Sequence, residues 1–254
     1  QYASTLANLR EHNNPAVRLG AVIALRKQSS PLLTHYLDDE DDAVATESAR
    51  AIHDVPVSEA LHELAQSLPD ARTYPWQRRA LSASERLGNN EYAQQIVEFA
   101  LDDSHAERMR LLALSMLSTW TSPPDREQVE GRWWPAKKFD HRSLEAVQSS
   151  LPSLIAASNG DALLKVFEIA QTYDFPLPED VSKKLLFDDS QHMDLRVFCL
   201  ASLATDDAIA FGLGHDSWRL RAEARLAKFS RGDDDAIDLL LDAVKHDVWQ
   251  AKQA

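Results

Sequence analysis

The stretch NPAVRLGAVIALRK, residues 14–27, decides the fold class of this chain. Pro15 is tolerated in the first turn of an α-helix, because its missing N–H would have no partner there, and Asn14 can act as the N-cap. Apolar side chains then recur at three- and four-residue spacing, which predicts a helix with one buried face. That face comprises Val17, Ala21, Ala24 and Leu25, with Leu19 one position off it and Arg18 and Arg26 beside it. We expect the small residues Gly20 and Ala21 to let a second helix approach closely.

Similar segments return along the chain. If Ala21 is taken as the anchor, the equivalent positions are Ser48, Ala80, Ala113, Val166, Cys199 and Ala222, which lie 27, 32, 33, 53, 33 and 23 residues apart in turn. A second apolar segment that ends in a short acidic step precedes several of them, as in YLDDEDD (36–42), ALDDSH (100–105) and LFDDSQ (186–191). The repeating unit is therefore a helix, an acidic turn and a second helix.

This repeat resembles HEAT and armadillo-like repeats over nearly the whole chain. The similarity rests on the residues that open the second helix of a unit, namely Asn14, Pro15, Val17 and Arg18 in the first unit and Leu195, Arg196 and Val197 in a later one. The resemblance implies an all-α fold, an α-solenoid of about seven to eight helix pairs with the last one truncated. In such a stack each pair packs on its neighbours and offers an extended surface for binding.

Composition excludes several classes of function. The formal net charge of −13 opposes nucleic-acid binding, which depends on Lys and Arg contacts to phosphate. Cys199 is the only cysteine, so an internal disulfide and a cysteine-based zinc site are excluded, and it is interpreted as a small buried residue. No run of 18 apolar residues is present, so we expect no membrane-spanning helix. No signal peptide is visible either, and residue 1 is Gln.

The repeat is interrupted once, by TSPPDREQVEGRWWPAKKFDHR at residues 121–142. The sequence thus predicts helix pairs over residues 1–120, an irregular insertion at 121–142 and further helix pairs over 143–254, all in one extended domain. The final unit supplies a first helix and stops a few residues into its partner. We therefore expect the chain to be a piece of a longer protein.

The insertion is the best candidate for an interaction site. Its prolines and Gly131 prevent a continuous helix, and a long irregular connection inside a compact domain is usually functional. Tryptophan and arginine are the residue types most enriched at binding hot spots. The candidate residues are Arg126, Arg132, Trp133, Trp134, Lys137 and Lys138. Two interpretations stay open: one tryptophan fills a groove of the solenoid, or the insertion docks a partner protein or neighbouring domain.

The acidic turns offer an alternative. Five consecutive acids, Asp38–Asp42, could hold a cation, but they lack the central glycine of a calcium loop and favour helix capping instead. His53, near the end of the following helix, is interpreted as a favourable cation there or as a polar terminus, and not as a ligand. A groove that binds a small molecule or acts as an enzyme would use turn residues such as Asp102, Asp103, Asp188, Asp189 and His105. Such chemistry needs two acids that converge in one pocket.

A closer resemblance concerns residues 1 to about 170. Segments such as LREHNNPAVRLGAVIALRK and DREQVEGRWWP resemble the helical-repeat region of large bacterial multidomain proteins. Those proteins combine a propeller related to quinone-dependent sugar or sorbosone dehydrogenases with a cytochrome c domain. The resemblance implies a spacer between these domains, in a secreted or periplasmic protein whose haem c or quinone lies outside this piece, since the chain has no Cys-x-x-Cys-His. We expect a non-catalytic scaffold without a metal or cofactor of its own, whose partners are proteins or neighbouring domains.

Overall fold

The computed structural model describes residues 2–135 and 142–246, and the chain divides into two compact units, residues 1–157 and 158–254. Within the described residues every regular element is helical, and one isolated antiparallel bridge pairs Arg126 with Trp133. None of the described helices is both long enough and apolar enough to cross a membrane. The predicted all-α class is therefore confirmed.

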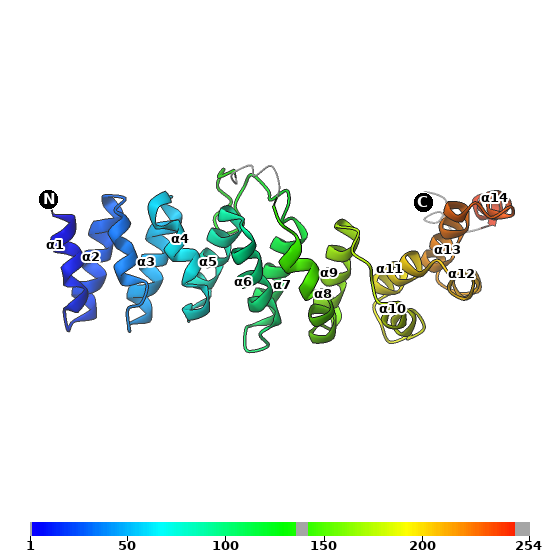
Figure 1. Cartoon of the computed structure of the whole chain (residues 1–254), viewed down its shortest axis with the longest axis horizontal. Coiled ribbons are helices and arrows are strands. Elements are labelled where there is room, and N and C mark those ends of the chain that lie inside the picture. Colours follow the sequence, from blue (N-terminus) through cyan, green and yellow to red (C-terminus); the bar gives the residue numbers. More distant parts are fainter. Residues whose placement is uncertain (1, 136–141, 247–254) are drawn as a thin grey trace. The chain divides into compact units, whose positions relative to one another are not determined.

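The first unit is a stack of helices that lie side by side in chain order (Figure 1). Most are α-helices, and short 3-10 helices (η) take the place of the first helix in some pairs. Its elements are α1 (Ala3–Ala7), η1 (Asn8–Glu11), α2 (Pro15–Lys27), η2 (Pro31–Tyr36), α3 (Asp42–Asp54), η3 (Ser58–Ala60), α4 (Leu61–Gln66), η4 (Leu68–Asp70), α5 (Tyr74–Leu87), α6 (Asn90–Leu101), α7 (Glu107–Ser118) and α8 (Glu145–Ala157).

The second unit continues the helix-pair pattern. In it α10 packs on α11, α12 packs on α13, and α11 packs on both α9 and α13. Its elements are α9 (Gly160–Thr172), α10 (Glu179–Leu186), α11 (Met193–Leu203), α12 (Asp206–Leu213), α13 (Trp218–Arg231) and α14 (Ala236–His246). The chain is thus an α-solenoid of HEAT-like helix pairs, as the repeat predicts.

Helix α2 begins as its sequence predicts but buries a somewhat different face. The Asn14 side chain accepts a hydrogen bond from the N–H of Ala16, which makes it the N-cap. The buried residues are Arg18, Ala21, Val22 and Leu25, whereas Val17 and Ala24 are only half-buried. The prediction for Gly20 is wrong, because Gly20 is exposed and a Cβ atom added there would meet open space. No close helix contact depends on it.

The anchor positions form the core of each unit. Six of the seven are buried, namely Ala21, Ser48, Ala80, Ala113, Val166 and Cys199. The seventh is corrected, since Ala222 is half-buried, whereas Ala224 of α13 is fully buried. Burial raises the pKa of the Cys199 thiol to about 12, so at neutral pH it stays protonated as an apolar core residue.

An arginine near the start of the second helix of several pairs joins that helix to the preceding turn or helix. Each donates to a backbone carbonyl at 2.9 Å, with the pairs Arg18 to His12, Arg110 to Ala100, Arg196 to Leu186 and Arg221 to His215. Buried carbonyls need such donors, because an unpaired one costs about as much as a lost hydrogen bond. This contact explains why arginine recurs at that place in the repeat.

The acidic turn at Asp38–Asp42 serves capping and ion pairing. Asp41 is the N-cap of α3 and accepts hydrogen bonds from the N–H groups of Ala43 and Val44, which confirms the capping interpretation. Asp39 forms a two-point ion pair with Arg18 at 2.8 and 2.9 Å, across the junction between two helix pairs. The turn therefore contributes to the packing of one repeat on the next.

Candidate functional site

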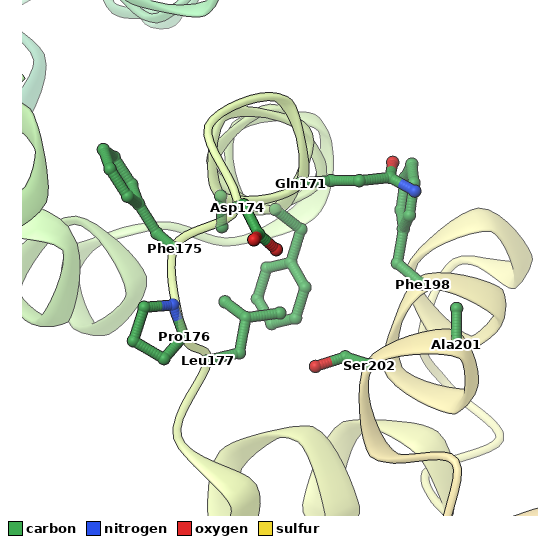
Figure 2. Close-up of a pocket in the computed structure, with 10 residues that line it drawn as sticks. Gln171, Asp174, Phe175, Pro176, Leu177, Phe198, Ala201 and Ser202 are labelled. Carbon is green, nitrogen blue, oxygen red and sulfur yellow. The ribbon is translucent and has the colours of Figure 1, made fainter. Parts of the chain in front are cut away.

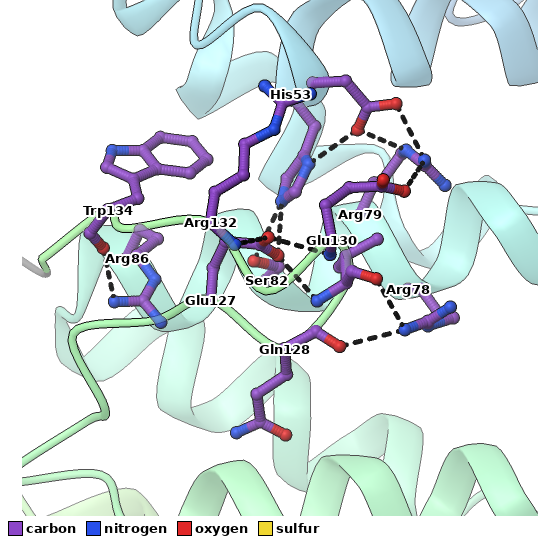
Figure 3. A network of polar contacts seen from close by, with 12 residues as sticks. His53, Arg78, Arg79, Ser82, Arg86, Glu127, Gln128, Glu130, Arg132 and Trp134 are labelled. Atoms are coloured by element: carbon purple, nitrogen blue, oxygen red, sulfur yellow. Dashed lines mark hydrogen bonds and ion pairs between the residues drawn. The ribbon is translucent and has the colours of Figure 1, made fainter.

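The insertion is held against α3 and α5 of the first unit by polar contacts (Figure 3). Its described part, residues 121–135, contains no helix, as the prolines and Gly131 predict. The bridge between Arg126 and Trp133 closes a short loop, in which Glu127 N–H donates to the carbonyl of Arg132 at 3.0 Å and Trp134 N–H to that of Asp125 at 2.8 Å. The segment thus has a defined backbone structure of its own.

Three arginines of α5 bind the backbone and side chains of this segment. Arg78 donates to the carbonyls of Gln128 and Val129 at 2.9 and 3.1 Å. Arg86, which is buried, donates to the carbonyls of Pro124 and Trp134 at 2.9 and 2.8 Å.

The third arginine, Arg79, is also buried and makes a two-point ion pair with Asp54 at 2.8 and 2.9 Å. It reaches the insertion as well, through the carboxylate of Glu130 at 3.0 Å. Hydrogen bonds between charged groups are the stronger ones, and a guanidinium can make several at once. The insertion is therefore fixed at several points along one helix.

Glu127 organises the loop from within. Its side chain is 1% exposed and accepts hydrogen bonds from the N–H groups of Val129, Glu130 and Arg132 at 2.6, 2.8 and 3.0 Å. Burial alone would raise the pKa of this carboxyl, but the three N–H donors outweigh it and hold the pKa of Glu127 below its ordinary value. The ionised form is thus part of the folded loop.

His53 connects Glu127 to the end of α3. Its Nδ1 lies 3.0 Å from Asp54 Oδ1, its Nε2 lies 3.0 Å from Ser82 Oγ, and Glu127 Oε2 is 3.7 Å from the same Nε2. Burial would raise the pKa of Asp54, yet hydrogen bonds from His53 and Arg79 lower it well below its ordinary range. At neutral pH the buried network therefore carries an anion at Asp54, which Arg79 balances.

These distances match those of a catalytic triad, with Ser82 in the place of the nucleophile, His53 in that of the base and Asp54 in that of the orienting acid. Ser82 is 0% exposed, however, and His53 is buried with it beneath the insertion. A nucleophile must reach its substrate, and the Ser82 hydroxyl at this position is not accessible from solvent. The arrangement acts as the anchor of the insertion.

The two tryptophans of the insertion occupy different environments. Trp134 is half-buried, with its ring edge-on to His53 at 5.3 Å between centroids. Trp133 is 67% exposed. Arg126 and Arg132 are exposed on the same loop, and Arg126 donates to the carbonyl of Gly131 at 3.0 Å. The remaining two candidates, Lys137 and Lys138, lie outside the described residues.

The tryptophan that fills the core at this place is Trp120, which directly precedes the insertion. It is fully buried, its indole N–H donates to the carbonyl of Ser143 at 3.0 Å, and the guanidinium of Arg142 lies 4.8 Å from its ring centroid. Both ends of the insertion are therefore attached to the core through one side chain.

The sequence interpretation missed the polar anchor. His53 is not a polar terminus but a buried centre of the network. A signal was present in α5, where Arg79, Ser82 and Arg86 recur at three- and four-residue spacing on a face that also carries buried apolar residues. Polar residues on a core-facing stripe need buried partners. The sequence could not show that Glu127 is one of them.

Four of the five residues of the alternative site, all but Asp103, take part in local contacts. Asp102 accepts from the N–H of Ser104, and the His105 ring stacks on Phe99 with centroids 3.8 Å apart. The side chains of Ser190 and Gln191 lower the pKa of Asp188 to about 2, and Asp189 pairs with Arg196 at 2.8 Å. Asp103 is exposed. Within residues 2–135 and 142–246, no group of three or more potential metal ligands is found.

Comparison with known proteins gives one kind of match. No family model matches this sequence, and no curated protein does. Among solved structures, a chain from the complex of CpcE and CpcF of phycocyanin lyase from Nostoc sp. PCC7120 is similar over 94% of this chain and 92% of that chain. The two share 14% sequence identity and superpose with a TM-score of 0.34.

Proposed function

We propose that this chain is a non-catalytic helical-repeat scaffold that docks a protein or a neighbouring domain through the insertion at residues 121–135. The observation that carries the proposal is the exposure of Trp133, at 67%, on a loop that buried charged groups hold in place. Large apolar side chains of this kind are enriched among the few residues that carry binding energy. Arg126 and Arg132 are exposed on the same loop, and arginine is likewise enriched at binding hot spots.

The way the loop is held supports this proposal. A partner that binds a mobile loop must order it, and that entropy cost reduces the affinity. Here Arg78, Arg79 and Arg86 bind the loop to α5, and Glu127 orders its backbone. Folding of the chain therefore already orders the loop backbone that carries Trp133, and the partner need not do so.

We further propose that the partner is a neighbouring domain of the same polypeptide, in a multidomain dehydrogenase with a cytochrome c domain. The support is the resemblance of segments within residues 1 to about 170 to the helical-repeat region of such proteins. The haem c or quinone would then belong to the other domains, and the whole protein would be secreted or periplasmic. A haemochrome spectrum of the full-length protein tests this assignment, and a spectrum without haem would contradict it.

Photo-crosslinking from position 133 tests the docking role. We would replace Trp133 by p-benzoylphenylalanine in the full-length protein and, as a matched control, Ile23, which is also an exposed apolar residue of the first unit. We expect a discrete adduct from position 133, mapped by mass spectrometry to one surface, and none from position 23. The adduct should weaken when Arg126 and Arg132 are changed to Ala. Equal, diffuse labelling from both positions would contradict the proposal.

A further inference from the structure

A pocket lies in the second unit between the end of α9 and the facing side of α11 (Figure 2). It forms where the helix pairs are interrupted by the connection YDFPLPE, residues 173–179, whose two prolines prevent a helix from filling the space. Its volume is about 540 Å³, within the range of pockets that bind small organic molecules. No residue of the insertion lines this pocket.

The end of α9 directs an acidic side chain into this pocket. Phe175 N–H donates to the carbonyl of Ala170 at 2.8 Å, which closes the helix and leaves Asp174 in the left-handed region with φ of 55°. Glycine is the residue usually found at such a helix end. Figure 2 shows the Asp174 carboxylate and the Ser202 hydroxyl both pointing into the space between the helices.

The lining combines aromatic rings with a single charge. Phe198 contributes a half-buried ring from α11 and Leu177 a half-buried aliphatic side chain from the connection, above the buried ring of Phe167 from α9. Of the 10 described residues that line the pocket, Asp174 alone carries a charge at neutral pH. Aromatic faces and a carboxylate both attract cations, and an apolar lining accepts the organic body that carries the cation.

We propose that this pocket binds a small organic cation, an amine or quaternary ammonium compound with an aromatic or aliphatic body. The cationic group pairs with Asp174, and the body packs against Phe198 and Leu177. Ser202 and Gln171 supply hydrogen-bonding groups at the rim. An organic anion of the same size is disfavoured by the same carboxylate and by the net charge of −13.

A fluorescence titration of the whole chain with dansylcadaverine tests this site. Its amine is protonated at neutral pH, and dansyl 6-aminohexanoate provides an anion with the same fluorophore and a similar tail. We expect saturable binding of the amine at low salt, about tenfold tighter than binding of the carboxylate. Absence of saturable amine binding, or equal affinity for both probes, would overturn the proposal.

Variants then locate the site. Asp174→Asn and Asp174→Gly both remove the charge at a position where either new residue tolerates the left-handed backbone, so we expect a folded protein that no longer distinguishes the two probes. Phe198→Ala should weaken the binding of both probes. Asp161→Asn removes the same charge from the first turn of α9, at its other end, and should leave the preference intact. A preference that survives Asp174→Asn, or that Asp161→Asn abolishes, would contradict the assignment.

Discussion

Asp54 shows at the scale of one residue how the insertion is attached. Its carboxylate is buried, and it joins His53 of α3 to Arg79 of α5, which in turn contacts Glu130 of the insertion. A buried ion pair need not add much stability compared with apolar residues, but removal of one partner leaves the other charge unbalanced. The attachment therefore depends on keeping both charges.

We expect Asp54→Asn to lower the free energy of unfolding of the first unit by about 2–4 kcal/mol, because Arg79 then loses its two-point ion pair and keeps only the more exposed carboxylate of Glu130 as a counter-charge. Denaturant titration followed by circular dichroism measures this loss. Asp103→Asn, an exposed acid of the same unit, serves as the control and should change the free energy by less than about 0.5 kcal/mol. A loss no greater than that of the control would show that the buried pair is dispensable.

The same residues set a pH dependence. Folding lowers the pKa of Asp54 and of Glu127, so each carboxyl binds fewer protons in the folded state than in the unfolded state. Their contribution is fully present above the unfolded pKa, about 4, and is lost as the pH falls through the folded pKa. Burial raises the pKa of Glu85, which acts in the opposite sense.

We therefore expect the free energy of unfolding of the first unit to fall between about pH 5 and pH 2, and the double variant Asp54→Asn, Glu127→Gln to show a shallower fall. Denaturant titrations at a series of pH values provide the slope. An unchanged slope in the double variant would mean that other carboxyls account for the acid sensitivity.

At the scale of the element, two glycines within helices have opposite environments. Gly212 lies inside α12, which runs to Leu213. A Cβ atom at Gly212 would lie 2.4 Å from the Leu200 side chain and 2.8 Å from the Cβ of Ala224. Gly20 of α2 faces open space. The close helix approach expected at Gly20 is found at Gly212.

Alanine substitution should consequently have opposite effects at the two positions. Gly20→Ala is expected to stabilise the chain by about 0.5–1 kcal/mol through helix propensity alone. Gly212→Ala is expected to destabilise it by about 1–3 kcal/mol, because overpacking outweighs that gain. Thermal unfolding of the two variants compares them directly. If Gly212→Ala were as stable as the parent chain, the tight packing of α12 would be refuted.

Helices were the most predictable feature of this chain, and the reasons are local. Asn14 and Pro15 mark the start of α2, and Gly88, with φ of 67°, ends α5 as a left-handed cap, because capping depends on a few neighbouring residues. The arginine at the start of a repeat helix was recognised by pattern, but its carbonyl partner was not. That partner lies in another segment, which local spacing cannot identify.

At the scale of the whole molecule, the sequence predicts where the repeat is interrupted but not what the interruption contacts. The anchor spacing of 53 residues located the insertion. Its attachment brings Glu127 to His53 and Arg86 to Trp134, pairs that are far apart in sequence and obey no period. The division into two compact units at residue 157 also has no local signal.

Two compact units should unfold separately. We expect two transitions in a denaturant or calorimetric unfolding curve, since each unit has its own core. Asp54→Asn should shift only the transition of the first unit, and Gly212→Ala only that of the second. If both variants displaced one common transition, the chain would behave as a single cooperative unit.

The groups around Trp134 anchor the insertion, and Trp133 is exposed on it. The free energy of unfolding of Trp133→Ala, measured beside that of Trp134→Ala, tests whether Trp133 is a docking residue and not part of the packed fold. We expect a change of less than about 0.5 kcal/mol for Trp133→Ala, an exposed side chain, and a loss of about 2 kcal/mol or more for Trp134→Ala, which removes the ring packed on His53. A loss for Trp133→Ala as large as that for Trp134→Ala would show that Trp133 stabilises the fold, and would contradict its role as a displayed docking residue.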